Sequence, residues 1–123
     1  MATEGMIGLY LETRSYTQAS AFWEALGYRS VFDTDHGSGQ WVHPSGGPYV
    51  FLAEQHDREV LEWHPILGVA DAGAFEAGAS VEVVRPFEPQ HWGVTEAMVR
   101  DPDGRGVSLQ APLPAGQEAP DGH

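Results

Sequence analysis

The side chains able to do covalent or acid–base chemistry are few in this 123-residue chain. There is no cysteine, so thiolate chemistry and disulfides are excluded. The chain also has no glycine-rich phosphate loop and no His-Glu-x-x-His pattern. Ser108 with His64 would give a base-assisted hydroxyl, but nothing in the sequence supplies a third, orienting group. These residues alone leave open whether the chain is an enzyme.

Aromatic side chains are the second chemically informative group. Of the four tryptophans, Trp41 lies on a short strand between two glycine turns, and Trp92 lies in a loop before a hairpin. Each could line the rim of a binding site or pack in a core or an interface. Trp23 and Trp63 are assigned to the core from their spacing with aliphatic residues. Tryptophan and tyrosine rings give large stacking areas at little cost in rotamer entropy, which suits planar aromatic ligands.

The first half of the chain predicts a strand, a helix and three further strands. Residues 6–12 alternate as a two-faced strand does. Ser15 and Gln18 then fit a capping box, and apolar residues at helical spacing predict a helix over about residues 16–26 that stops before Gly27. Turns rich in glycine and proline separate the remaining strands, which are residues 28–33, 40–43 and 49–54.

The second half repeats this order with a shorter helix. Its clearest feature is a hairpin over residues 95–112, in which Asp101-Pro102-Asp103-Gly104 fits a type I turn. Before the hairpin come a strand at residues 60–69, at most two helical turns at 71–78, a strand at 80–85 and a loop at 86–93. We therefore expect an α+β fold divided into a first module (1–54), a linker (55–59), a second module (60–111) and a disordered tail (112–123).

Composition and charge exclude several classes of partner. The net charge is −12, from 18 acidic and 6 basic residues, and this argues against a nucleic-acid partner because phosphate binding needs a Lys/Arg surface. An acidic surface is compatible with a cationic ligand, although it also serves solubility alone. No apolar run reaches membrane-spanning length. The lack of cysteine and of a secretion signal favours the cytoplasm.

Two segments give the chain a family resemblance. FWEALGY at Phe22–Tyr28 and HWGVTEAMVRDPDGRGVSL at His91–Leu109 resemble the vicinal oxygen chelate superfamily, which holds glyoxalase I, extradiol dioxygenases and bleomycin-resistance proteins. The Phe22-Trp23 pair resembles the bleomycin-resistance branch most. The resemblance implies two βαβββ modules that curl into a mixed-sheet cup. It also implies a homodimer in which both chains complete each cup, with a small molecule bound inside, sometimes on a metal.

The same resemblance bears on metal binding. The positions that match the family's metal ligands are Gly8, Phe51, His64 and Ser108, and only His64 could ligate strongly. A catalytic divalent site needs about three protein ligands. We therefore expect neither a metal nor another cofactor. A rearranged site using Glu54, Glu62 or His64 is the alternative.

Strand alternation then divides the residues between two faces. If the four matched positions point inward, Met6, Tyr10, Tyr49, Glu62, Ile66 and Gln110 join them. Aliphatic residues would occupy the opposite, helix-packed face, namely Ile7, Leu9, Leu11, Val50, Leu52, Val107 and Leu109. A face of aromatic rings with isolated polar groups is typical of a small-molecule pocket. The predicted ligand-binding residues are Tyr10, Trp41, Tyr49, Phe51, His64, Trp92, Ser108 and Gln110.

These observations favour a metal-free protein that binds and sequesters an antibiotic or another aromatic natural product and so confers resistance. The alternative is a metal-dependent lyase, isomerase or dioxygenase-like enzyme of the same superfamily with a non-standard site. A third reading is a subunit without a cofactor that only dimerises and supports another enzyme. Metal content would separate the first two readings, and ligand binding would separate the first from the third.

Overall fold

The computed structural model describes residues 2–114, which form two compact units. The first unit is Ile7–His64. The second unit joins the described residues up to Met6 with those from Pro65 onward. The predicted tail at 112–123 falls mostly outside the described residues, and Pro112 itself still belongs to a strand. Among the residues described, no helix is long and apolar enough to cross a membrane.

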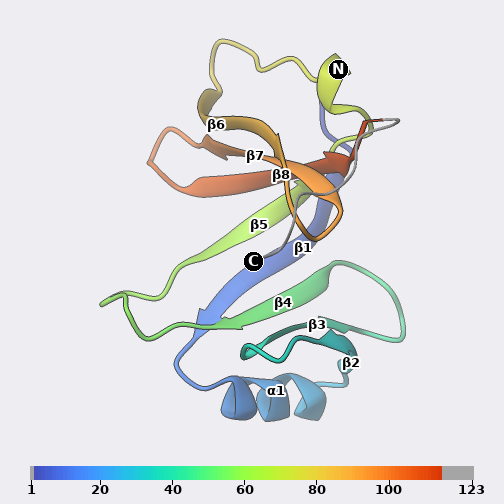
Figure 1. The fold of residues 1–123 in the computed structure, drawn as a ribbon, viewed down its shortest axis with the longest axis vertical. Coiled ribbons are helices and arrows are strands. Elements are labelled where there is room, and N and C mark those ends of the chain that lie inside the picture. The colour runs from blue at the N-terminus through green and yellow to red at the C-terminus, as the bar shows by residue number, and fades with distance from the viewer. Residues whose placement is uncertain (1, 115–123) are drawn as a thin grey trace. The chain divides into compact units, whose positions relative to one another are not determined.

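The first unit is a four-stranded sheet with one helix on one face (Figure 1). In chain order it contains β1 (Gly5–Thr13), α1 (Tyr16–Ala25), β2 (Arg29–Asp33), β3 (Ser38–Val42) and β4 (Tyr49–Glu54). The strand order is β2-β3-β4-β1, with β1 parallel to β4 and the other two pairs antiparallel. The helix begins as predicted, because the Ser15 hydroxyl accepts a hydrogen bond from the Gln18 N–H at 3.2 Å.

The second unit repeats that topology with a reduced helix. It contains β5 (Trp63–Gly68), the 3₁₀ turn η1 (Ala72–Ala74), β6 (Glu82–Pro89), β7 (Val94–Arg100) and β8 (Gly106–Pro112), in the sheet order β5-β8-β7-β6. Strand β5 is parallel to β8, as β1 is to β4. The prediction of an α+β fold with two βαβββ modules is confirmed. How the modules pair, in one chain or in a dimer, stays a prediction.

Several boundaries differ from the sequence prediction, among them the start of β5 at Trp63 instead of residue 60. The Glu4 N–H donates to the Gly68 carbonyl at 2.7 Å, so the first residues of the chain pack with the second unit. Strand β6 continues to Pro89, where a loop was predicted. It is the outermost strand of its unit's order and carries two register shifts against β7. Such bulged outer strands tolerate proline, which is why Pro86 does not end it.

Each unit has its own apolar core, and Val50, Leu52 and Leu109 of the predicted aliphatic face lie in these cores, whereas Ile7 is 37% exposed. In the first unit Trp41, Val50 and Leu52 are buried and pack against residues of helix α1, including Ala19 and Trp23. The second core consists of Val69, Ala97, Val99, Leu109 and Ala111. Alternate residues of β4 and β8 face these cores, as period-2 alternation requires.

One core assignment is wrong. Trp63 shares its spacing with Leu61 and Leu67, yet its side chain is 65% exposed. It lies at the first, exposed position of β5, and neither buried cluster includes it. Alternation along a strand predicts which face a side chain lies on, but it predicts burial only where that face is covered along the whole strand.

Candidate functional site

A row of aromatic rings crosses the first unit on the face opposite helix α1, called here the helix-free face. Strand register places Tyr10 opposite Phe51, Phe51 opposite Gln40 and Gln40 opposite Phe32, so the row spans β1, β4, β3 and β2. The ring centroids of Tyr10 and Phe51 lie 6.2 Å apart with an interplanar angle of 14°, and those of Phe51 and Phe32 also lie 6.2 Å apart. The imidazole of His64 stacks on Tyr10 at 4.8 Å. We call Phe32, Phe51, Tyr10 and His64 the aromatic row.

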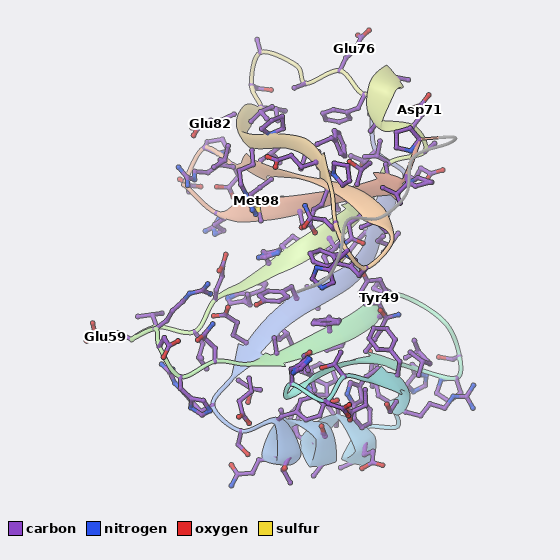
Figure 2. The ribbon with its side chains drawn as sticks, in the orientation of Figure 1. Tyr49, Glu59, Asp71, Glu76, Glu82 and Met98 are labelled. Atoms are coloured by element: carbon purple, nitrogen blue, oxygen red, sulfur yellow. The ribbon has the colours of Figure 1, made fainter. Side chains whose placement is uncertain are left out.

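Next to this row, the ring of Tyr49 lies over the backbone of Gly8. The two residues are register partners on β4 and β1. A Cβ added to Gly8 would stand 2.5 Å from two carbon atoms of the Tyr49 ring, well inside van der Waals contact. Glycine is therefore required at position 8 by close approach of an aromatic ring. Figure 2 labels Tyr49 at the start of β4.

A carboxylate, Glu12, is buried at one end of the row. Its side chain is fully buried and accepts hydrogen bonds from the Tyr10 hydroxyl at 2.9 Å and the Glu62 N–H at 2.9 Å. The Arg58 guanidinium also donates to Glu12, and it reaches the carboxylate of Glu62 at 3.1 Å. Another oxygen of Glu62 lies 3.5 Å from Nδ1 of His64. This group links the aromatic row to the connection between β4 and β5.

The contacts fix the protonation states of this cluster. Burial alone would raise the pKa of Glu12, but the hydrogen bonds from Glu62, Tyr10 and Arg58 outweigh it, and the pKa is lowered. Burial, together with the hydrogen bond to Glu12, raises the pKa of Tyr10 to about 12. Near neutral pH Glu12 is therefore an ionised acceptor, and Tyr10 is a neutral phenol that donates its proton to it.

The connection that brings Arg58 to Glu12 is itself anchored. The Arg14 guanidinium donates to the carbonyl of Gln55 at 3.0 Å and to that of Glu59 at 2.9 Å, and it also reaches the Arg58 carbonyl. Glu59 stands at the outer tip of this connection (Figure 2). Two arginines from different parts of the chain thus hold the connection against the end of β1.

The second unit carries a smaller polar group on the face opposite its core. The Ser108 hydroxyl, fully buried, donates to Oε2 of Glu96 at 2.6 Å. The Gln110 amide donates to the same oxygen at 3.0 Å. Register places Glu96 opposite Gln110 on the β7–β8 hairpin, and Ser108 lies opposite Met98. Half-buried Glu96 is thus held in place by two predicted site residues.

The structure separates the predicted site residues into three groups. Tyr10, Phe51 and His64 come together in the aromatic row, with Tyr49 beside it. Ser108 and Gln110 meet at Glu96. The two tryptophans fall elsewhere. Trp41 is 5% exposed and lies in the first core beside Val50 and Leu52, so it packs in a core and does not line a rim. Trp92 is 52% exposed in the turn between β6 and β7.

Several functional candidates were missed by sequence reasoning. Glu12 carried a usable signal, since it is two residues from Tyr10 on one strand and must share its face. Glu96 could have been found by counting back from the Asp101–Gly104 turn, which fixes the hairpin register. Phe32 and Arg58 had no recognisable signal in the sequence. A bulge in β2 positions Phe32, and a contact with Glu12, 46 residues away in the chain, positions Arg58.

The positions matched to the family's metal ligands do not suit a metal. Gly8 lies beneath the Tyr49 ring, Phe51 is part of the row and the Ser108 hydroxyl is committed to Glu96. Only His64 offers a strong donor. In the part of the chain that the structure describes, no three His, Cys, Asp or Glu residues group as a metal site would need.

Glu54, named in the alternative site, has a different role. Its carboxylate accepts the N–H of Tyr16 at the start of helix α1 at 2.8 Å and contacts Nε2 of His56 at 3.0 Å. These two hydrogen bonds lower its pKa. On β4, Glu54 shares the face of Val50 and Leu52, opposite to that of Phe51. It therefore belongs to the helix side of the sheet and is not available to the aromatic row.

No protein-family model and no curated protein matches this chain. Solved structures do share its fold. A glyoxalase/bleomycin resistance protein/dioxygenase superfamily member from Vibrio splendidus 12B01 superposes with a TM-score of 0.65 at 15% identity, over 85% of this chain and 96% of that one. BphC, a halotolerant catechol dioxygenase, gives a TM-score of 0.64 at 15% identity over 98% of this chain, which spans 42% of that protein.

A third structure, described as an NAD-dependent benzaldehyde dehydrogenase from Legionella pneumophila, gives a TM-score of 0.61 at 12% identity, over 85% of this chain and 96% of that one. The chain therefore has the fold of the vicinal oxygen chelate superfamily, as its two sequence segments predicted. At 12–15% identity the likeness is one of fold. Function must come from the residues that this chain places on the fold.

Proposed function

We propose that this protein is a metal-free binding protein that sequesters an aromatic small molecule, such as an antibiotic or another natural product, and confers resistance to it. The observation that carries the proposal is the aromatic row. Three rings from three strands and the imidazole of His64 follow one another across the helix-free face. Offset stacking on such rings favours planar aromatic ligands over aliphatic ones.

The size of the effect is sufficient for useful affinity. Each aromatic pair contributes roughly 0.5–1.5 kcal/mol beyond the burial of its area. The planes of the Tyr10 and Phe51 rings are within 14° of parallel, so a planar ligand in the same orientation would complement both rings. Phe32 is 47% exposed and can still gain contacts from a ligand. Because Tyr10 is fixed by Glu12, little side-chain entropy is lost when a ligand binds.

The predicted residues of the second unit form a polar group of their own. In the second unit, Ser108 and Gln110 act through the carboxylate that they hold, Glu96. Trp92 offers an exposed indole, packed edge-to-face on His91 at 4.8 Å. Trp41 is left out of the ligand contacts, since its ring is enclosed in the first core.

The proposal is tested by a ligand screen against planar aromatic natural products, read by the shift in melting temperature. We expect hits among fused-ring compounds and none among aliphatic compounds of equal size. Protection of a susceptible bacterial strain by expression of the protein would then test resistance. A screen in which no aromatic compound raises the melting temperature would refute binding, and unaltered compound susceptibility would refute sequestration.

The enzyme alternative is supported by one observation, the approach of Glu62 to His64. The 3.5 Å separation of Oε1 and Nδ1 places an acid–base pair beside the aromatic row. A metal at this pair would compete with the Arg58 guanidinium for Glu62. Metal analysis of protein purified without chelators decides between the two functions. About one equivalent of a divalent ion per chain would favour the enzyme.

A homodimer is part of the proposal. The first unit leaves Phe22, Leu26 and Val31 between 49% and 58% exposed, and exposed apolar residues in this number are typical of surfaces that a partner covers. A second copy with two-fold symmetry is the simplest partner. Sedimentation equilibrium at micromolar concentration tests this directly, and a monomer would contradict it.

A further inference from the structure

We propose that the Tyr10 end of the helix-free face selects ligands that donate hydrogen bonds, such as aromatic N–H or O–H compounds, because the Tyr10 oxygen is left as an acceptor. This inference rests on the proposed function and adds the chemical class of the ligand. It comes from the direction of the hydrogen bonds, which the aromatic row alone does not determine.

The Tyr10 hydroxyl is carried by a ring of the aromatic row itself. A phenol has one proton, and here that proton is directed to Oε2 of Glu12 at 2.9 Å. Glu12 is fully buried and also accepts from Arg58 and from the Glu62 N–H, so it is held as an acceptor-only carboxylate. What the Tyr10 oxygen can still offer a ligand is its lone pairs. A ligand N–H satisfies them, whereas a ligand oxygen in the same place would meet another acceptor.

The charges around Tyr10 act in the same direction. Glu12 and Glu62 both contact the Arg58 guanidinium, so two carboxylates lie near the Tyr10 hydroxyl, while the Arg14 guanidinium lies at the carbonyl oxygens of the same connection. The whole chain carries −12. Negative potential stabilises the positive end of an N–H or O–H dipole and disfavours an exposed ligand oxygen.

The polar group of the second unit is built on the same principle. The Ser108 hydroxyl and the Gln110 amide both donate to Oε2 of Glu96, so two donors are consumed by one carboxylate. Glu96 is half-buried and is the charged acceptor of that face. Each unit thus uses a glutamate, Glu12 or Glu96, to bind the protons of the neighbouring polar side chains.

The test compares two bicyclic probes of nearly equal size and shape, indole with an N–H donor and benzofuran with an oxygen acceptor, by ligand-observed NMR titration. We expect indole to bind wild-type protein about two- to tenfold more tightly, as one net hydrogen bond predicts. Tyr10→Phe keeps the ring and removes the oxygen, so the ratio should fall to about one while benzofuran affinity is retained. Tyr28→Phe removes the same oxygen from a tyrosine that packs beside the first core, and should leave the ratio unchanged.

A second variant tests the role of Glu12. Glu12→Gln can donate an amide N–H to Tyr10 and release the phenol proton toward the ligand, so the preference for indole should disappear or reverse. Equal affinities of the two probes for wild-type protein, or a ratio that survives Tyr10→Phe, would overturn the inference while leaving aromatic binding in place. If neither probe binds although the screen gives aromatic hits, the inference alone fails; if the screen gives no aromatic hit, the proposed function fails and the inference fails with it.

Discussion

Alanine at position 8 should destabilise the protein because a single methyl group would enter the space of the Tyr49 ring. The added Cβ would lie 2.5 Å from Cε1 and Cζ and 2.7 Å from Cδ1, whereas ordinary carbon contacts are 3.4–4 Å. The ring must therefore move by about 1 Å, and overpacking of this kind costs about 1–3 kcal/mol. A glycine-to-alanine change without strain instead stabilises by about 0.4–1 kcal/mol through the unfolded chain. Gly78→Ala is the matched control, since nothing lies within 4 Å of its Cβ.

Urea denaturation of four proteins measures this effect: wild type, Gly8→Ala, Tyr49→Ala and the double variant. In the double variant the ring is gone, so the methyl group should cost almost nothing, and the coupling energy should reach about 1–3 kcal/mol. Gly8→Ala should also weaken aromatic ligands, because the displaced Tyr49 ring disturbs the surface beside the row. If Gly8→Ala behaves like Gly78→Ala, the ring does not lie over Gly8, and the geometry described for this face is incorrect.

Three further predictions concern the core and the Glu12 cluster. Trp41→Ala should lower the free energy of unfolding by about 3–5 kcal/mol because it leaves a cavity in the first core. Trp92→Ala, at an exposed turn, should change it by at most about 0.5 kcal/mol. Equal losses of stability in urea denaturation would refute the two placements. In ultraviolet titration, one of the four tyrosines should ionise at a pKa of about 12 and be missing in Tyr10→Phe. Since this folded-state pKa is raised, the stability contributed by Tyr10 is present below pH 10 and is lost as the pH rises toward 12. A free energy of unfolding that does not change over this alkaline range would contradict the prediction. The folded-state pKa of Glu12 is lowered, so its contribution is present above pH 4.5 and is lost as the pH falls, and Glu12→Gln should flatten this acid limb.

Local rules predicted much of the fold. Ser15 and Gln18 predicted the start of helix α1, and the Asp101–Gly104 turn predicted the hairpin, in which the Gly104 N–H donates to the Asp101 carbonyl at 3.0 Å. Alternation placed Leu52 and Leu109 in the cores. These features depend on residues that are neighbours in sequence, and propensity and alternation describe such neighbours well.

Sequence reasoning failed where residues far apart in sequence determine the structure. Trp41 enters the first core because β3 pairs with β4, and that register was not fixed by any local signal. Arg58 reaches Glu12 because Arg14 anchors the connection between them. Phe32 joins the row through a bulge in β2. Strand faces could therefore be predicted, whereas the partners across strands could not.

Affinity of Phe51 variants for the best aromatic ligand of the screen is the measurement that tests the central claim most directly. Phe51 stands in the middle of the aromatic row, between Tyr10 and Phe32. Phe51→Leu keeps an apolar side chain and removes stacking, so the Kd should rise about two- to tenfold, and Phe51→Ala, which also loses burial, should raise it further. Phe87→Ala, which disrupts the Phe75–Phe87 pair of the second unit, is the control and should leave the Kd unchanged. An unchanged Kd in both Phe51 variants, with the fold intact by circular dichroism, would contradict the proposal that the aromatic row binds the ligand.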